Sequence, residues 1–266
     1  MTRMRLQGAR VLLTGASGGI GQAIARRLAR EGSQLVLTGR RADILDELAA
    51  ELGARALAID LARRKEVRRL LKGAGEIDVL IANAALPATG RLAKLDRERV
   101  DGALEVNLRA PIALAHALAP AMAARGRGHL VFIGSLSGKA PTAGSSLYNA
   151  TKFGLRGFAL SLRAELAPAG VGVSLVAPGF VSTAGMYAET QIELPRGVST
   201  RTPEQVADAV VHAIVRNRGE VDVASISMRL GADLSNLAPG LAARANRALG
   251  GERLALEFER RQSEKR

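Results

Sequence analysis

A glycine-rich turn near the N-terminus constrains the fold of this chain more than any other stretch. The turn runs from Gly15 to Gly21, follows a short apolar run, Arg10 to Thr14, and precedes a helical pattern of apolar residues. Strand, glycine turn and helix in this order place unpaired backbone N–H groups at a helix N-terminus, where the helix dipole favours negative charge. The pattern predicts a βα unit that binds a diphosphate, with an ordinary glycine-rich turn as the alternative.

Seven short apolar runs, separated by helical patterns, extend this unit into a whole sheet. We expect strands at residues 10–14, 34–38, 54–59, 77–82, 130–134, 171–176 and 220–226. Alternation of this kind predicts parallel strands joined by right-handed helical crossovers. The expected fold class is therefore α/β: one Rossmann-like domain, residues 1–227, with a three-layer, doubly wound, seven-stranded parallel sheet. Residues 228–266 are expected to form a helical C-terminal extension.

Composition excludes several classes of function. The chain of 266 residues has no cysteine, and its histidines, at positions 116, 129 and 212, are scattered. Thiolate metal sites and cysteine nucleophiles are therefore excluded, and we expect no metal. No run reaches the roughly 18 apolar residues of a membrane-spanning helix, and Met1 to Arg10 lacks the apolar segment of a signal peptide. We expect a cytoplasmic protein.

The formal net charge of +13 comes mostly from arginines that are spread along the expected helices among acidic residues. Charge of this size fits nucleic acid, an acidic membrane surface or acidic small molecules. Aromatic residues make up only 3% of the chain, so basic and aromatic side chains do not interleave as they do where bases are stacked. We interpret the charge as a solvated surface and expect no nucleic-acid partner.

A tyrosine and a lysine one helical turn apart are the best candidates for acid–base chemistry. Tyr148 and Lys152 lie four residues apart, so on a helix they share one face and address one small volume. Upstream, the fifth apolar run ends at Ser135, and open α/β sheets place their ligands at this end of the strands. A surface tyrosine beside a surface lysine, and a serine in an ordinary turn, are the alternatives.

Taken in order, these motifs resemble the short-chain dehydrogenase/reductase family. The family's cofactor motif is Thr-Gly-x-x-x-Gly-x-Gly, which matches Thr14 to Gly21, and the resemblance covers about residues 8 to 226. It implies that a nicotinamide dinucleotide lies against the glycine turn, whose contacting residues are Gly15, Ser17, Gly18, Gly19, Ile20 and Gly21.

Two arginines after the second expected strand indicate which dinucleotide is bound. In NAD sites an acidic residue about 20 residues beyond the glycine turn accepts the ribose hydroxyls, whereas an arginine accommodates a 2′-phosphate. Here Arg40 and Arg41 stand at that point, and Asp43 is better explained as a residue of the first helical turn. We expect NADP(H) in preference to NAD(H), with Arg40 as the main contact and Arg41 and Ser17 in support. The alternative is a solvated approach to the next helix.

The resemblance assigns further cofactor contacts at the ends of other strands. Asp60 would lie at the adenine edge with Leu61 beside it, and a helix N-cap at Asp60 is a compatible alternative. The family usually has Asn-Ala-Gly after the fourth strand, where this chain has Asn83, Ala84 and then Ala85. After the sixth strand the resemblance places the nicotinamide against Pro178, Gly179, Val181 and Thr183.

The same resemblance implies the roles of four catalytic residues. Ser135 and Tyr148 would hold a carbonyl oxygen, and Tyr148 would donate its proton as the alcohol forms. A free phenol titrates near pH 10, so Lys152 is expected to lower the pKa of Tyr148 and to bind the nicotinamide ribose. Asn107, inside a helical pattern from about Asp96 to Ala124, would bend that helix and support a water. An exposed Asn, or one bonded to a neighbouring carbonyl, is the alternative.

The resulting hypothesis is an NADP(H)-dependent oxidoreductase that reduces a ketone or aldehyde to an alcohol, or runs the reverse reaction. A non-catalytic NADP(H)-binding sensor or scaffold is the alternative. Residues 184–200, which lack periodicity and include Met186, Tyr187, Ile192 and Leu194, are expected to form a substrate loop for an apolar small molecule.

Assembly is expected through the helix that begins at Tyr148, because the family often packs this helix against a second subunit as a homodimer or homotetramer. In the extension, Leu234, Leu237 and Leu241 have helical spacing, followed by a charged stretch with Leu254 and Phe258. Of three alternatives for the extension, we rank packing on another subunit first, covering the pocket second and contact with a membrane last.

Overall fold

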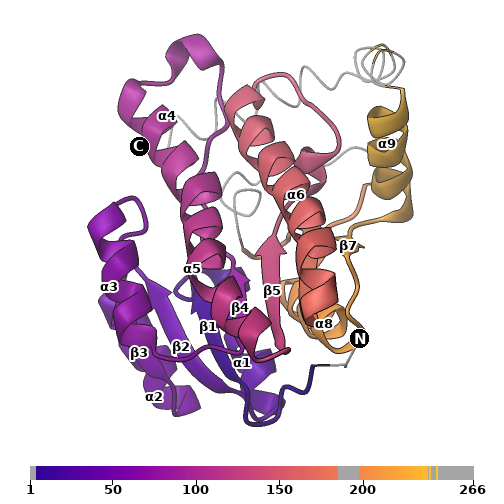
Figure 1. Cartoon of the computed structure of the whole chain (residues 1–266). Helices are drawn as coiled ribbons and strands as arrows, with labels where there is room; N and C mark the ends of the chain where they lie inside the picture. The colour runs from indigo at the N-terminus through magenta and orange to yellow at the C-terminus, as the bar shows by residue number, and fades with distance from the viewer. Residues whose placement is uncertain (1–3, 185–197, 239, 241–243, 245–266) are drawn as a thin grey trace.

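Seven parallel strands form one sheet in the order β3-β2-β1-β4-β5-β6-β7 (Figure 1). The structure is a computed structural model that describes residues 4–184 and 198–238, together with residues 240 and 244. The strands are β1 Arg10–Thr14, β2 Gln34–Gly39, β3 Arg55–Ala58, β4 Val79–Ala82, β5 Gly128–Ile133, β6 Val171–Pro178 and β7 Glu220–Val223. The expected doubly wound, parallel, seven-stranded sheet is confirmed.

The residues of each strand point alternately to the two faces of the sheet, and both faces are covered by helices. Val11 and Leu13 of β1 pack with one cluster of buried residues, whereas Leu12 between them packs with the other. Burial on both faces explains why the strands read as continuous apolar runs rather than as alternating ones.

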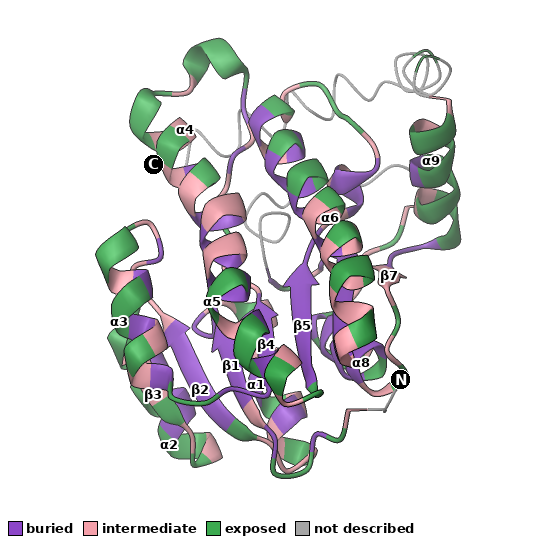
Figure 2. Ribbon diagram, viewed as in Figure 1, coloured by how far each residue is buried: buried purple, intermediate pink, exposed green. Residues whose placement is uncertain are grey.

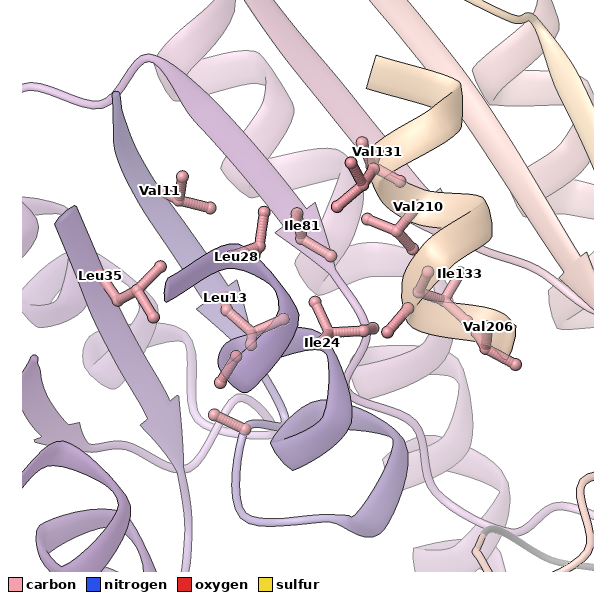
Figure 3. Packing of buried hydrophobic residues seen from close by; sticks show 14 of the residues in the cluster. Val11, Leu13, Ile24, Leu28, Leu35, Ile81, Val131, Ile133, Val206 and Val210 are labelled. Carbon is pink, nitrogen blue, oxygen red and sulfur yellow. The ribbon is translucent and has the colours of Figure 1, made fainter. Parts of the chain in front are cut away.

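One helical layer consists of α1 Gly19–Arg30, α2 Ala42–Leu52 and α8 Pro203–Arg216. Figure 3 shows Ile24 and Leu28 of α1 against Leu13 and Ile81, and Val206 and Val210 of α8 toward Val131 and Ile133. The other layer consists of α3 Arg64–Ala74, α5 Ala110–Ala124 and α6 Ser146–Leu166, which lie in front of the sheet in Figure 1. In Figure 2 these helices are buried toward the sheet and exposed on the outside.

The single helix expected between Asp96 and Ala124 is divided in three. Asp96 caps α4, Arg97–Leu104, by accepting a bond from the Arg99 amide. A π-helical segment, Glu105–Arg109, then connects α4 to α5. Such wide turns inside α-helices are frequent at functional sites, and this one contains Asn107.

The C-terminal part departs from expectation at the last strand, which ends at Val223 rather than at residue 226. Helix α8 begins with a capping box between Thr202 and Gln205 and has Pro203 at its first position. Helix α9, Ile226–Leu237, starts two residues inside the expected domain boundary, because Ser225 takes the extended N-cap conformation. Short one-turn segments lie at Leu92–Lys94, Leu136–Gly138 and Ala167–Ala169.

Part of the expected substrate loop and extension lies outside the described residues. This applies to Met186, Tyr187, Ile192 and Leu194, and in the extension to Leu241, Leu254 and Phe258. A search of the described helices finds none with the length and apolar character needed to span a bilayer.

A pair of isoleucine substitutions tests how the core is built. Ile24 is fully buried under α8, whereas Ile226 at the start of α9 is 73% exposed. We expect Ile24→Ala to lower the free energy of unfolding by about 2 to 5 kcal/mol, and Ile226→Ala to change it by less than about 0.5 kcal/mol. Urea unfolding followed by circular dichroism measures both. Equal losses for the two variants would contradict the packing of α1.

Candidate active site

The site lies at the carboxyl edge of the sheet, where β1 and β4 are neighbours. From β1 the chain winds outward to β2 and β3, then returns to the other side of β1 and continues to β7. The crossovers on the two sides leave in opposite directions, so a crevice opens above the ends of β1 and β4. The loops that follow β1 to β6 carry most of the residues predicted to bind and react.

The glycine turn after β1 needs glycine because the backbone crosses itself closely. Gly15 has a φ of +66°, and a Cβ atom there would lie 2.7 Å from the Ala84 Cα atom. A Cβ on Gly21 would lie 2.1 Å from the Gly15 carbonyl oxygen. Gly18 caps α1, whose first turn contains no acidic side chain. The turn therefore presents the positive end of a helix dipole to the crevice, as a diphosphate requires.

A buried hydroxyl joins the ends of β1 and β4. Thr14 Oγ1 accepts the backbone N–H groups of Asn83 at 3.0 Å and Ala84 at 3.1 Å. The Asn83 amide donates in return to the carbonyl oxygens of Thr14 and Gly15. Ala85, which replaces the family's usual glycine, is not among the residues with positive φ. The alanine therefore fits the loop without backbone strain.

The two arginines expected at a 2′-phosphate lie next to this turn. A guanidinium nitrogen of Arg41 donates to the carbonyl oxygen of Ser17, whose side chain is buried. Arg40 is exposed at the end of β2, and the Ala16 amide donates to the β2 carbonyl of Thr38 at 3.0 Å. Guanidinium groups beside a helix N-terminus form a donor set that fits a phosphate on an adenosine ribose.

Asp60 starts a turn and does not cap a helix. Its carboxylate accepts the Ala62 amide at 3.0 Å, and α3 begins four residues later with Arg63 as its N-cap. The alternative explanation of Asp60 as a helix N-cap is therefore wrong, because the extended residue before α3 is Arg63. Leu61 is buried in the core beside this turn.

The segment after β6 returns to the glycine turn. Pro178 ends the strand, Gly179 donates to Val223, and Val181 is buried and forms an isolated bridge with Arg201. Thr183 is exposed. A Cβ atom on Gly19 would lie 2.6 Å from the Ala184 Cβ atom. The residues predicted to hold the two ends of a dinucleotide therefore belong to adjoining loops.

Three of the four predicted catalytic residues lie together at the end of β5. Ser135 follows the strand in an extended conformation, and its hydroxyl is close enough to the Tyr148 phenol to lower the pKa of that phenol. The Lys152 ammonium lies 5.6 Å from the centre of the Tyr148 ring. Lys152 is buried and donates to the Ile133 carbonyl oxygen at 2.9 Å. As the helical spacing predicts, Tyr148 and Lys152 face one volume, although α6 begins at Ser146 rather than at Tyr148.

Burial controls the ionisation of this pair. Desolvation raises the pKa of Tyr148 to about 12, and the bond from Ser135 lowers this pKa in part. Burial also lowers the pKa of Lys152 to about 8. The expectation that Lys152 lowers the Tyr148 pKa is therefore wrong for the protein alone, because the low dielectric around both groups disfavours their charged forms.

For Asn107 the structure shows the alternative explanation, in which the side-chain amide bonds to a neighbouring segment of the chain. It is buried in the π-helical segment; its Oδ1 accepts the Leu86 amide at 2.6 Å, and its Nδ2 donates to the Leu86 carbonyl oxygen at 2.9 Å. Its side chain thus holds the loop after β4, which carries Asn83 and Ala84. Its bonds to Leu86 use one donor and one acceptor of the amide.

Sequence reasoning missed the bridging role of Thr14 and assigned none to Asn149, which is buried next to Tyr148. An Asn in the first turn of a helix is a poor helix former and could have been examined for a partner in the way Asn107 was. His129 bonds to Ser174 in the core, and burial lowers its pKa to about 3. Within residues 4–184 and 198–238, no three His, Asp or Glu side chains gather where they could hold a metal ion.

Comparisons with known proteins agree with this geometry. The sequence model described as short chain dehydrogenase matches residues 9–193. The ketoacyl reductase HetN of Nostoc is 38% identical over 227 residues, which are 82% of this chain and 79% of that protein.

Solved structures give the same result. A short-chain dehydrogenase from Sphingobium yanoikuyae, in complex with NADPH, is 32% identical with a TM-score of 0.74, and the match covers 93% of this chain and 94% of that one. A bulky-bulky ketone specific alcohol dehydrogenase from Comamonas testosteroni is 28% identical with a TM-score of 0.75, covering 91% of this chain and 95% of that one.

The buried lysine predicts a pH dependence of stability. The folded protein holds the Lys152 proton less tightly than the unfolded chain does, since its pKa falls from 10.5 to about 8. Stability should therefore rise as the pH rises from about 8 to about 10, by roughly 2 kcal/mol. Titration of Tyr148 contributes equally to the pH dependence of wild type and of a Lys152→Met variant. The difference in unfolding free energy between the two proteins therefore isolates the contribution of Lys152. Urea unfolding without nucleotide at several pH values measures it, and parallel curves would refute the buried ammonium.

Proposed function

Since this chain belongs to the short-chain dehydrogenase family, we propose that it is an NADP(H)-dependent reductase of ketones or aldehydes, or the corresponding alcohol dehydrogenase. The observation that carries the proposal is the gathering of Ser135, Tyr148 and buried Lys152 at the end of β5, where the Lys152 ammonium lies 5.6 Å from the centre of the Tyr148 ring and Ser135 lowers the Tyr148 pKa. Two hydroxyls at the carboxyl edge of the sheet can bind one carbonyl oxygen, and a phenol can give it a proton.

The chain's own residues perform the acid–base part of this reaction. Bound NADPH supplies the hydride that a carbonyl carbon needs. Ser135 and Tyr148 hold the carbonyl oxygen, and Tyr148 transfers its proton to it. Lys152 stabilises the resulting tyrosinate when it is charged and binds the nicotinamide ribose. We assign to the π-helical segment at Asn107 the support of a water that returns the proton to Tyr148.

The preference for NADP(H) rests on the donor set around the glycine turn. Arg40 is exposed beside that turn, and Arg41 is bonded to the Ser17 carbonyl oxygen. Both would meet a 2′-phosphate with positive charge. The solved structure of the Sphingobium relative contains NADPH, which supports the same choice. Asp60, Leu61, Asn83 and Ala84 would line the adenosine half, and Pro178, Gly179, Val181 and Thr183 the nicotinamide half.

The substrate we propose is an apolar carbonyl compound. The Nostoc relative is named a ketoacyl reductase and the Comamonas relative a ketone specific alcohol dehydrogenase, and both names describe reduction or formation of a carbonyl group. Residues 184–200 remain our proposal for the substrate loop.

We further propose a homodimer or homotetramer that forms through α6, on which Phe153 is partly exposed. Helix α9 exposes Ile226, Leu230, Leu234 and Leu237 along one side. For this extension, subunit packing is our first proposal, a cover for the pocket the second, and membrane contact the last.

A carbonyl panel tests the reaction. NADPH absorbance followed with apolar ketones and aldehydes should fall in the presence of wild type, and Tyr148→Phe should reduce kcat by at least about 100-fold because the proton donor is lost. NADPH affinity measured by calorimetry should stay the same. Ser174→Ala, which removes a buried hydroxyl within β6, serves as the control for folding. Turnover that survives Tyr148→Phe would contradict the acid role. Binding without turnover would favour the non-catalytic alternative.

Cofactor choice has its own test. Arg40→Ala should weaken NADPH binding by about 10- to 100-fold, since a charge-assisted bond to phosphate is lost, and should leave NADH binding unchanged. Arg30→Ala, at the exposed opposite end of α1, makes the same change of charge away from the turn. Calorimetric titrations of the three proteins with both nucleotides decide. An equal loss for NADPH and NADH would exclude a 2′-phosphate contact at Arg40.

A further inference from the structure

The loop that carries Ser135 is tied to the helix that carries Tyr148 by one buried side chain. Asn149 follows Tyr148 in α6, and its Nδ2 donates to the carbonyl oxygens of Ser137 at 2.6 Å and Ala140 at 3.1 Å. Its Oδ1 accepts the Thr142 amide at 3.3 Å. A carboxamide has two N–H donors, so both donors and the oxygen are engaged with residues 137–142.

These contacts continue to the catalytic hydroxyl. The Ser137 amide donates to Ser135 Oγ at 3.1 Å, while the Ser137 carbonyl accepts from Asn149. A serine hydroxyl has one donor hydrogen besides its two acceptor lone pairs, so Ser135 Oγ can accept from the Ser137 amide and also donate to the Tyr148 oxygen. Tyr148, Ser135, Ser137 and Asn149 thereby form a closed ring of contacts that begins and ends in the first turn of α6.

Apart from Asn149, few contacts fix the position of the loop at residues 136–140 relative to Tyr148. Its helical part, Leu136–Gly138, is a single turn, which holds few internal hydrogen bonds. It also presses on α6, because a Cβ on Gly138 would lie 2.8 Å from the Lys152 carbonyl oxygen. On the far side, the Lys139 ammonium pairs with Asp222 at 2.8 Å, which fixes the loop to β7 but not to Tyr148.

We infer that Asn149 is a positioning residue that sets the Ser135 hydroxyl against the Tyr148 phenol by holding the carbonyl groups of Ser137 and Ala140. Asn149 is buried and acts through Ser137, whose amide in turn donates to Ser135 Oγ. The inference rests on the proposed carbonyl reduction, in which both hydroxyls bind one oxygen. It explains why a residue that forms helices poorly occupies the first turn of α6.

A double-mutant cycle tests the inference through activity. Asn149→Ala should lower kcat by roughly 10- to 100-fold, the loss expected when a reacting group is misplaced. In the Ser135→Ala background the same change should lower kcat by less than about 3-fold, because the hydroxyl that Asn149 positions is already absent. NADPH affinity should be the same in all four proteins. Equal losses in the two backgrounds, or an unchanged kcat, would overturn the positioning role.

Further variants separate positioning from folding. Asn149→Asp keeps the acceptor for the Thr142 amide but turns a carboxylate oxygen toward two carbonyls, so kcat should fall as in Asn149→Ala. Gly138→Ala displaces the same loop but leaves Asn149 in place, and it should lower kcat in the same way. If Asn149→Ala fails to fold, the Gly138→Ala variant takes its place. Ser174→Ala, another buried polar change, should lower stability and leave kcat unchanged. A loss of kcat in Ser174→Ala equal to that in Asn149→Ala would attribute the effect to stability alone.

A readout at neutral pH does not depend on turnover. The chain has two tyrosines, so carbon-13 labelling of the tyrosine Cζ atoms gives two signals, which Tyr187→Phe assigns. Loss of the Ser135 hydrogen bond in Ser135→Ala should move the Tyr148 signal. Asn149→Ala should move it in the same direction, with no further change in the double variant. A Tyr148 signal that does not move in Asn149→Ala would overturn the inference. If wild type reduces no carbonyl compound, the proposed function is overturned, and the Tyr148 signal still decides whether Asn149 positions Ser135.

Discussion

The junction of β1 and β4 is the constraint on which the rest of the molecule depends. Thr14 joins the two strand ends through its hydroxyl, and Gly15 approaches Ala84 so closely that no side chain fits between them. At this point the chain reverses the direction in which it adds strands, so the crevice and the glycine turn arise from the same packing. A sheet of strands paired in this order places every other reactive loop on the same edge.

The reactive centre owes its character to burial. Lys152 lies under the end of β5 and bonds to the Ile133 carbonyl oxygen, while Tyr148 beside it meets the Ser135 hydroxyl. Desolvation disfavours charge on both Tyr148 and Lys152, so the protein alone keeps the phenol protonated. A protonated phenol is the form that can act as a proton donor. Asn149, which follows Tyr148 in α6, donates to the carbonyl oxygens of Ser137 and Ala140 and so ties the loop after Ser135 to this helix.

Much of the fold could be predicted from local patterns. The seven strands and the glycine turn each depend on residues within one turn or one strand, and their expected positions agree with the observed bounds to within a few residues. The family resemblance implies a bend at Asn107, but no local pattern gives the division of the helix into three segments or the end of β7 at Val223, because both depend on partners far along the chain. Asn107 leaves the α-helical pattern where its amide binds the loop at Leu86. Asp60 was open to two explanations until the position of α3 showed that it starts a turn.

The sequence by itself determined the class of fold and singled out Tyr148 and Lys152 as a candidate acid–base pair, since apolar periodicity, the glycine spacing and the four-residue step between these two residues are local properties. The tertiary structure alone decided which groups meet and what charge they carry. Ser135 and Tyr148 are brought together by the packing of the turn Leu136–Gly138 against α6, and the pKa of Tyr148 follows from the depth of burial there. Contacts between distant segments and the dielectric around them depend on the whole fold, and no local pattern contains them.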